Sequence, residues 1–326
     1  MITKKMSNNN NNLDSKGAIA LVGETIDEVM RYYVGNRGTI SKIVAAVISG
    51  GHVLMEDYPG LGKTFVAKLL ANVLGLSYKR IQFTPDLLPS DILGTKVWRP
   101  LKGEFELIQG PIFANLILAD EINRAPPKTQ AALLEAMEEG QVTIEGQTVR
   151  LPFPFIVLAT QNPIEFEGTY PLPEAQLDRF MIRMSLGYPE QEIDLLKRRV
   201  SWRKDDPSDS AKKVMTADLL SQTRALVESS VNISDEVLFY IVEFSQVRKD
   251  PRVLAGPSPR GLLSLMRLSR AIAMLEQRDF VIPDDVKSVV KETLAHRLVL
   301  KQEFSLEQID PGKILDEYVA KIAVPK

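Results

Sequence analysis

Cysteine is absent from this chain of 326 residues, and histidine occurs only as His52 and His296. The lack of cysteine excludes disulfides, thiolate metal sites and cysteine nucleophiles. The two histidines lie far apart in sequence, and neither has the neighbours of a metal ligand or of a serine-triad base. No apolar run approaches the roughly 18 residues that span a bilayer. The N-terminus lacks the apolar core of a secretory signal, so we expect a soluble cytoplasmic protein without a membrane segment.

The chain also lacks an excess of charge of either sign, because 40 basic residues face 42 acidic ones. Such a balance provides no general attraction to nucleic acid or to an anionic membrane. Hydrophobic residues make up 44% of the sequence, which is enough for a real core. The length suits two compact domains.

Four segments differ in character. Residues 1–14 include the polar run SNNNNN and are predicted to be a disordered tail. Residues 15–189 alternate between apolar strands and helices, which predicts a mostly parallel sheet covered on both faces. Residues 190–215 read as a charged helix followed by a polar loop that links two domains. Residues 216–326 show helical periodicity, with a helix start at Ser258 and Pro259, and are predicted to form an all-α domain.

Within residues 15–189, strands are expected in HVLME (52–56), ANLILADEI (114–122) and FPFIVLATQN (153–162). Amphipathic helices are expected from the apolar spacing at 40–48 and in KTFVAKLLANVLG (63–75) and KTQAALLEAMEEG (128–140). The Glu138–Glu139 pair at the end of the last helix is expected to be solvated. VWRPLKGEFEL (97–107) and QVTIEGQTVRL (141–151) alternate around a glycine and predict two inserted β-hairpins.

The stretch LMEDYPGLGKTFVAKLL (54–70) matches most of the phosphate-binding pattern G-x-x-x-x-G-K-[ST]. Gly60 and Gly62 allow the backbone to approach phosphate oxygens, Lys63 reaches the terminal phosphates, and Thr64 holds Mg²⁺. Asp57 stands where the pattern has its first glycine, and we expect it to bond local backbone N–H groups and stabilise the turn. The alternative is an ordinary glycine-rich turn before a helix.

A second signal is the pair of carboxylates in LILADEIN (116–123). Two adjacent acids after a buried strand are costly without a partner, and Mg²⁺ provides one. Asp120 is expected to hold the metal, and Glu121 to act as general base toward the attacking water. The alternative is a solvated acidic turn.

Four motifs together resemble the MoxR family of AAA+ ATPases, in the clade that carries a helix-2 insert. They are EDYPGLGKT, LADEINRAPPKTQAALLEAMEEGQVT, LATQNPIEFEGTYPLPEAQLDRF and GPSPRGLLSLMRLSRA, and the resemblance spans about residues 35–271. It implies a P-loop NTPase fold, in which a parallel-sheet α/β core with β-hairpin inserts precedes a smaller all-α lid. It also implies Mg²⁺-dependent hydrolysis of ATP to ADP. The form EDxPGxGKT is common in that family, so Asp57 is no defect.

The resemblance assigns further residues. Asn162 matches sensor 1, Arg179 the arginine finger that projects into a neighbouring subunit, and Arg260 sensor 2. Arg124 belongs to the family signature, with an intersubunit or sensing role. The alternatives are a turn asparagine for Asn162, an exposed arginine for Arg260, and for Arg179 a surface salt bridge with Glu174 or Asp178. The residues expected to contact nucleotide are Val34, Gly35, Pro59, Gly60, Leu61, Gly62, Lys63, Thr64 and Phe65.

The function that the resemblance implies is chaperone-like remodelling. A homo-oligomeric ring, expected to be a hexamer, would help to mature or assemble client protein complexes with a partner that carries a von Willebrand factor A domain. The hairpins around Gly103 and Gly146 resemble inserts that face a central pore, or they only extend the sheet. A nucleic-acid motor of the same clade is the alternative function, and the charge balance argues against it. A non-catalytic nucleotide switch is a third, which the presence of Glu121 and Arg179 disfavours.

Overall fold

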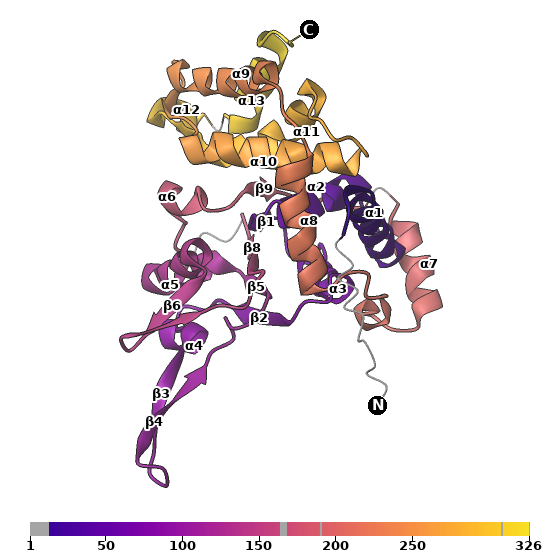
Figure 1. Ribbon diagram of the computed structural model, residues 1–326. Helices are drawn as coiled ribbons and strands as arrows, with labels where there is room; N and C mark the ends of the chain where they lie inside the picture. Colours follow the sequence, from indigo (N-terminus) through magenta and orange to yellow (C-terminus); the bar gives the residue numbers. More distant parts are fainter. Residues whose placement is uncertain (1–12, 164–167, 190, 308, 326) are drawn as a thin grey trace, which may run out of the picture.

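The computed structural model describes residues 13–163, 168–189, 191–307 and 309–325 (Figure 1). Most of the predicted tail, residues 1–12, lies outside the described residues. Its last two residues belong to the folded part. The Leu13 N–H donates to the Gln222 side chain at 3.0 Å, and the Asp14 carboxylate caps helix α1 (Ser15–Tyr32) through the Gly17 N–H at 2.8 Å.

The core is a five-stranded parallel sheet in the order β2–β5–β8–β1–β9. The strands are β1 (Val53–Glu56), β2 (Tyr78–Gln82), β5 (Leu116–Asp120), β8 (Ile156–Gln161) and β9 (Ile182–Met184). The sequence predicts β1, β5 and β8 from their apolar runs. It gives little sign of β2, an edge strand with mostly polar side chains, or of β9, which has three residues. These two strands depend on pairing with a neighbour rather than on their own pattern.

Alternate side chains of the central strands pack on opposite faces of the sheet. Val53 and Met55 join a buried cluster with α1, α2 (Arg37–Ile48) and α3 (Lys63–Val73), whereas Leu54 joins a second cluster with α4 (Pro89–Leu93) and α5 (Pro127–Glu139). Figure 1 shows α3 and α5 on opposite sides of the sheet. The predicted two-faced covering is confirmed, and it leaves the carboxyl ends of the strands as the open edge.

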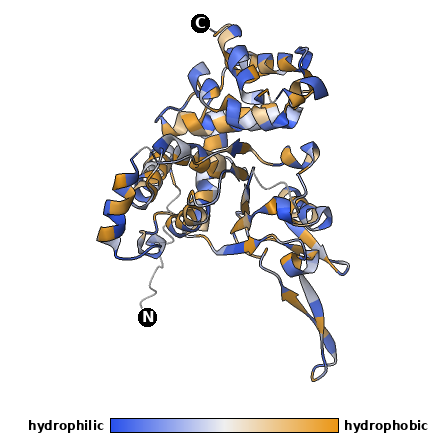
Figure 2. Ribbon diagram, turned by 180° about the vertical axis from the view of Figure 1, so that it is seen from behind, coloured by the Kyte–Doolittle hydropathy of each residue, from blue (hydrophilic) through white to orange (hydrophobic). Residues whose placement is uncertain are grey.

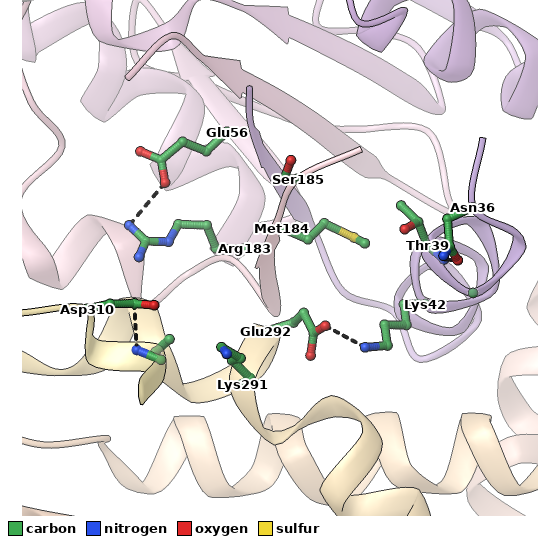
Figure 3. A pocket seen from close by; sticks show the side chains of 13 residues that line it. Asn36, Thr39, Lys42, Glu56, Arg183, Met184, Ser185, Lys291, Glu292 and Asp310 are labelled. Atoms are coloured by element: carbon green, nitrogen blue, oxygen red, sulfur yellow. Dashed lines mark hydrogen bonds and ion pairs between the residues drawn. The ribbon is translucent and has the colours of Figure 1, made fainter. Parts of the chain in front are cut away.

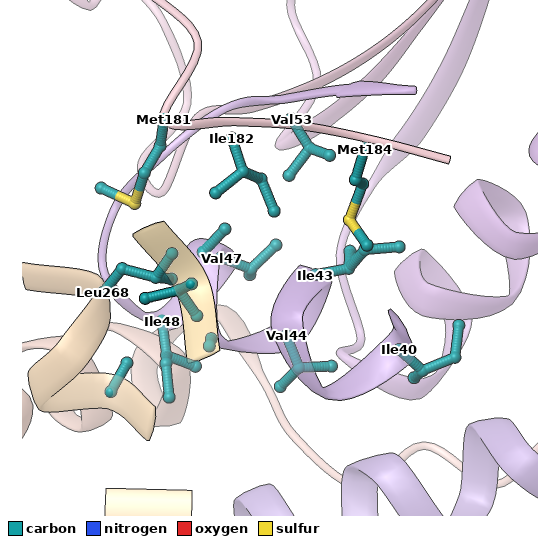
Figure 4. Close-up of a cluster of buried hydrophobic side chains, with 14 of the residues drawn as sticks. Ile40, Ile43, Val44, Val47, Ile48, Val53, Met181, Ile182, Met184 and Leu268 are labelled. Atoms are coloured by element: carbon teal, nitrogen blue, oxygen red, sulfur yellow. The ribbon is translucent and has the colours of Figure 1, made fainter. Parts of the chain in front are cut away.

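Helix α2 is buried on more sides than its amphipathic spacing predicts. Its buried residues are Ile40, Ile43, Val44, Ala45, Ala46, Val47 and Ile48. The sheet covers one side through Val53 and Ile182, and Leu268 of α10 (Pro259–Leu275) approaches from the other (Figure 4). A helix between two layers has no solvent face to keep polar. The apolar core therefore runs without a break from the sheet into the C-terminal helices.

Both predicted hairpins are present as antiparallel pairs. β3 (Gly94–Arg99) pairs with β4 (Glu104–Gln109) and projects away from the sheet (Figure 1), and β6 (Gln141–Ile144) pairs with β7 (Gln147–Arg150). Their turns place Gly103 at φ 65° and Gly146 at φ 80°, in the left-handed region that glycine adopts without a Cβ clash. The Thr95 hydroxyl lies 3.3 Å from a Glu145 carboxylate oxygen and links the two hairpins.

Among the residues that the structure describes, the remaining regular elements are helices and one short strand pair. The elements are α6 (Glu174–Leu177), α7 (Glu192–Trp202), α8 (Ala217–Ser230), α9 (Asp235–Glu243), β10 (Val253–Ala255), α10, α11 (Pro283–Leu294), β11 (Val299–Leu300), α12 (Gln302–Leu306) and α13 (Pro311–Lys321), with 3₁₀ turns at Ile122–Arg124, Ser208–Ser210, Phe244–Lys249 and Ala295–Arg297. Helix α10 begins as predicted, with Ser258 as N-cap and Pro259 in its first turn. The outer helices alternate hydrophobic and hydrophilic residues (Figure 2). No helix in the described part of the chain is long and apolar enough to cross a membrane.

His52 supports the core in its neutral form. Its Nδ1 accepts from the Val157 N–H at 3.0 Å, and its Nε2 lies 3.2 Å from the Met137 carbonyl. Burial lowers the pKa of His52 from 6.5 to about 4. The stabilisation by neutral His52 is therefore complete above the unfolded pKa of 6.5 and is lost as the pH falls toward 4.

We expect the free energy of unfolding to fall by about 2 kcal/mol on this account between about pH 7.5 and about pH 5. Urea unfolding at both pH values measures it, with His52→Gln as the comparison. The glutamine amide can keep one acceptor and one donor but does not titrate, so its pH dependence should be shallower. Burial also lowers the pKa of His296. Because His296 is present in both proteins, its contribution to the pH dependence cancels in the comparison. Equal pH dependence in the two proteins would contradict the assignment.

Candidate functional site

The loop between β1 and α3 has the backbone of a phosphate cradle. Gly60 has φ 85° and Gly62 has φ 81°, conformations that side-chain-bearing residues rarely adopt. Gly62 is the N-cap residue of α3 and has no side chain to cap the first turn. No side chain therefore caps the start of α3, where the helix dipole and the N–H groups of the first turn favour an anion.

The residues of this loop and the ends of two strands line one cavity of about 390 Å³. Its lining consists of Pro59, Gly60, Leu61, Gly62, Lys63, Thr64, Phe65, Asp120, Glu121, Thr160 and Asn162. The Lys63 ammonium donates to the Asp57 carbonyl at 2.5 Å, which holds its side chain against the loop. The structure thus brings the predicted loop, the predicted carboxylates and Asn162 to one place.

Asp120 is buried and bound on both of its oxygens. Oδ1 accepts from the Thr160 hydroxyl at 2.6 Å, and Oδ2 lies 3.5 Å from the Thr64 hydroxyl. Arg80 on β2 approaches Oδ2 with Nε at 2.9 Å and Nη2 at 2.7 Å. No sequence motif indicated Arg80 or Thr160. Only the pairing of β5 with β2 and β8 brings them to Asp120.

Glu121 has φ 57° and ψ 50°, a left-handed conformation that costs a non-glycine residue on the order of 1–3 kcal/mol. Its N–H donates to the Thr160 hydroxyl at 2.8 Å. Its carboxylate accepts from Gln82 Nε2 at 2.8 Å and from Arg124 Nη1 at 3.0 Å. These bonds hold the strained residue and orient its carboxylate. Arg124 and Gln82 therefore belong to the site because they position Glu121.

The donor set fits a magnesium ion that arrives with a nucleotide. The Thr64 hydroxyl and the Asp120 carboxylate are hard oxygen ligands of the kind that Mg²⁺ prefers. Among the described residues there is no cluster of three or more His, Asp or Glu side chains that would form an all-protein metal site. Magnesium in nucleotide sites takes its other ligands from phosphate and water, so two protein oxygens suffice.

A second cavity, of about 190 Å³, adjoins the loop and suits an adenine ring. It shares Gly60, Gly62 and Phe65 with the first and adds Val34 and, from α7, Trp202. Aromatic and aliphatic walls are typical of base-binding pockets. Gly35, also predicted to contact nucleotide, lines a neighbouring cavity of about 480 Å³ that Val34 borders too. Trp202 was not predicted, because α7 reads only as a charged linker helix.

Arg179 and Arg260 are not among the described residues that line the loop cavity. Both instead pair with Glu138 at the end of α5: Arg179 Nη2 lies 3.0 Å from Oε2, and Arg260 Nη2 bonds Oε1. Glu138 is exposed, as expected, but its two ion pairs were not predicted. Arg179 thus pairs with neither Glu174 nor Asp178 among the ion pairs of the described residues, and Asp178 accepts from Arg297 Nε at 2.6 Å.

The expectation that Asp57 bonds its local turn is also wrong. Its carboxylate accepts from the Ser185 hydroxyl, from the Leu186 N–H at 2.7 Å and from the Gly187 N–H at 3.4 Å. These residues follow β9, which lies beside β1 in the sheet. Asp57, only 4% exposed, thus ties the loop to the neighbouring strand.

Ion pairs continue from this point to the C-terminal helices. Glu56 of β1 pairs with Arg183 of β9 at 3.4 Å, and Lys42 of α2 pairs with Glu292 of α11. Both pairs border a polar cavity of about 550 Å³ between the sheet and α11 (Figure 3). The first pair therefore joins β1 to β9, and the second joins α2 to α11 across the same cavity.

Comparisons with known proteins agree with this geometry. The ATPase family associated with various cellular activities (AAA) matches residues 52–182, and an AAA lid domain matches residues 245–318. Chaperone MoxR1 of Mycobacterium tuberculosis is 40% identical, over 92% of this chain and 81% of its own. The chain belongs to the MoxR family of AAA+ ATPases.

Two further relatives cover nearly the whole of this MoxR-family chain. The uncharacterized protein YeaC of Bacillus subtilis is 46% identical, over 94% of this chain and 95% of its own. The crystal structure of a candidate ATPase from Cytophaga hutchinsonii is 40% identical and superposes with a TM-score of 0.86, covering 96% of this chain and 97% of that one. The family establishes the activity as ATP hydrolysis and the fold as a parallel-sheet core with a helical lid.

Asp57 provides a test of how this MoxR-family ATPase holds its loop. In Asp57→Ala, three donors at Ser185, Leu186 and Gly187 lose a buried charged acceptor, which is expected to cost about 3 kcal/mol of stability. Nucleotide affinity should fall as well, because the loop loses its anchor to β9. Asp57→Asn keeps one oxygen acceptor and should lose less. Urea unfolding and titration with a fluorescent ADP measure both effects. Unchanged stability and affinity in Asp57→Ala would refute the anchor.

Proposed function

We propose that this chain forms a hexameric ring that uses Mg²⁺-dependent ATP hydrolysis to remodel client protein complexes. The observation that carries the proposal is the single cavity that contains Lys63, Thr64, Asp120, Glu121 and Asn162. These residues come from the ends of three adjacent strands and provide a cation, metal ligands, a carboxylate base and an amide within one space. Phosphoryl transfer needs little more from the protein than such positioning and charge.

Phosphate binding is the first task of the cavity. The uncapped start of α3 and the Lys63 ammonium would hold the β- and γ-phosphates. Thr64 and Asp120 would hold Mg²⁺, which neutralises charge on the phosphate oxygens. The adenine would lie between Val34 and Trp202 in the adjoining cavity. The phosphates and the adenine ring of the nucleotide would then be held on opposite sides of the same loop.

Water activation is the task of Glu121. Its left-handed backbone and its bonds to Gln82 and Arg124 hold the carboxylate at the rim of the cavity. From there it would accept a proton from the attacking water, while the Asn162 amide orients that water and senses the γ-phosphate. Thr160 supports both acids, since its hydroxyl donates to Asp120 and accepts from the Glu121 N–H.

Arg179 and Arg260 would complete the site of a neighbouring subunit. Their side chains are 28% and 47% exposed, and they lie outside the lining of their own loop cavity. A guanidinium placed against the transferred phosphoryl group offsets the charge that develops there. ATP hydrolysis would then require the assembled ring, which supports an oligomer as the working form.

Client binding is assigned to the projecting hairpin β3–β4. Trp98 and Phe105 are exposed on it and pack edge to face, with ring centroids 5.1 Å apart. Arg99 pairs with Glu106 at 2.8 Å, so its charge is partly compensated. The hairpin carries three basic and two acidic side chains, and an aromatic surface with so small an excess of charge suits a protein client better than a nucleic acid. A chaperone role agrees with the name of the relative MoxR1, and a partner with a von Willebrand factor A domain is part of this proposal.

Glu121→Gln tests the assignment of the base. Loss of the general base should lower the rate of ATP hydrolysis by about 10²- to 10⁴-fold, while ATP binding is retained. Lys63→Ala should instead lose binding. Phosphate release and titration with a fluorescent nucleotide separate the two effects. If Glu121→Gln hydrolysed ATP at the parental rate, Glu121 would not be the base.

Arg179→Ala tests the trans arrangement. The variant alone should lose about 10³-fold or more in turnover. Mixed with Glu121→Gln subunits, it should regain activity, because each Glu121→Gln subunit offers an intact Arg179 to its neighbour's intact cavity. Mass measurement with ATP and with ADP shows whether a ring forms and of what size. A ring that forms but gains nothing on mixing would rule out the trans role.

A further inference from the structure

We propose that Glu138 is a positioning residue that joins Arg179 and Arg260 into one two-arginine clamp for the triphosphate of a neighbouring subunit. The inference rests on the proposed function, in which both arginines act in trans. The inference adds Glu138 to the proposed site. No sequence motif had assigned a role to this residue. It also unites a group from the sheet core with one from the lid.

Glu138 uses one carboxylate oxygen for each arginine. Oε2 lies 3.0 Å from Arg179 Nη2, and Oε1 bonds Arg260 Nη2. A guanidinium has five N–H donors, and the ion pair with Glu138 involves one terminal nitrogen of each arginine. Donors therefore remain on both arginines for a second anion. All three side chains are partly exposed, so a neighbouring subunit can reach them.

The lid sets the position of the turn that carries Arg179. Arg297, whose side chain is 2% exposed, donates to the Asp178 carboxylate at 2.6 Å and to the carbonyls of Asp178 at 3.0 Å and Phe180 at 2.7 Å. Ser258, the N-cap of the helix that carries Arg260, donates to the Asp178 carboxylate at 2.9 Å. Residues on both sides of Arg179 are thus bound to the lid. Arg179 and Arg260 must move together when the lid moves.

Electrostatics explains why the pair needs Glu138. Three arginines, 179, 260 and 297, meet two carboxylates, Asp178 and Glu138, so the net charge of the cluster is 3 − 2 = +1. Asp178 is occupied by Arg297. Without Glu138 the charge rises to 3 − 1 = +2, and Arg179 and Arg260 would repel each other. Glu138 therefore lets two guanidiniums stay close while the cluster keeps a net positive charge for phosphate.

The first test replaces the charge and keeps the shape. Glu138→Gln should reduce ATP turnover by roughly 10- to 100-fold, because misplacement by about 1 Å can cost that much. The KM for ATP should stay within about 2-fold, since the subunit's own loop cavity is intact. Glu138→Asp keeps the charge and should retain more activity. Glu139→Gln is the matched control, because Glu139 is exposed at the same helix end and makes no ion pair with the described residues.

Mixing shows whether the effect crosses the subunit boundary. Glu138→Gln subunits combined with Glu121→Gln subunits should regain turnover, because the latter present an intact clamp to the former's intact cavity. A purely structural role within one subunit would not be relieved in this way. In an Arg260→Ala background, Glu138→Gln should cause a smaller further loss than in the parental protein, since only the contact with Arg179 remains to be broken.

The outcomes separate this inference from the proposed function. Suppose that Arg179→Ala regains activity on mixing while Glu138→Gln has parental activity. This result would overturn the two-arginine clamp but would still support the action of Arg179 in a neighbouring subunit's site. Faster turnover in Glu138→Gln also overturns it, because Glu138 would then block the arginines. Failure of both variants to regain activity on mixing removes the trans arrangement itself. Thermal melting checks that each variant folds. If Glu138→Gln has a lower melting temperature than the parental protein, Glu138→Asp and the variants in the Arg260→Ala background test the inference instead.

Discussion

The pairing of β1 between β8 and β9 is the constraint on which the rest of the structure depends. It places the loop after β1 beside the ends of the strands that carry Thr160 and Asp120. On its other side it brings Asp57 to the backbone that follows β9. Because parallel strands end at the same edge of a sheet, the groups needed for phosphate binding meet there without further adjustment.

Strain at this edge is held by the surrounding bonds. The left-handed backbone of Glu121 is supported by Thr160, which bonds its N–H, and by Gln82 and Arg124, which bond its carboxylate. The same Thr160 hydroxyl donates to Asp120, so the two acids share one support. In the proposed role of base, a carboxylate that is fixed before the substrate arrives does not need to reorganise during the reaction, and preorganised charge of this kind lowers a barrier.

The lid is connected to the core in two places with different consequences. Lys42 and Glu292 join it beside β9, on the side of the nucleotide loop. Arg297 and Asp178 join it beside the turn that carries Arg179. Since buried apolar packing around α2 makes the core and lid continuous, a lid displacement would be felt at both places. In the proposed ring, the nucleotide state of one subunit would thus change the arginines that this subunit presents to the next.

The sequence by itself determined the loop, the carboxylate pair, the strands β1, β5 and β8, both hairpins and the family. These signals are local: glycine and lysine spacing, apolar runs and turn residues act within a few positions of one another. The sequence did not predict the contacts of Arg80, Gln82 and Thr160, because these contacts form between neighbouring strands that lie far apart in the sequence.

The partners of Asp57, the burial of α2 and the Glu138 cluster were decided only by the tertiary structure. Each depends on which surface faces the residue after folding. The sequence shows Glu138 only as a carboxylate at a helix end, and its contact with Arg260 forms only when the lid packs against the core. A periodic helix looks amphipathic until a second layer covers its polar side. Local sequence carries no record of such contacts, because the free energy that forms them comes from packing between segments that lie far apart in the chain.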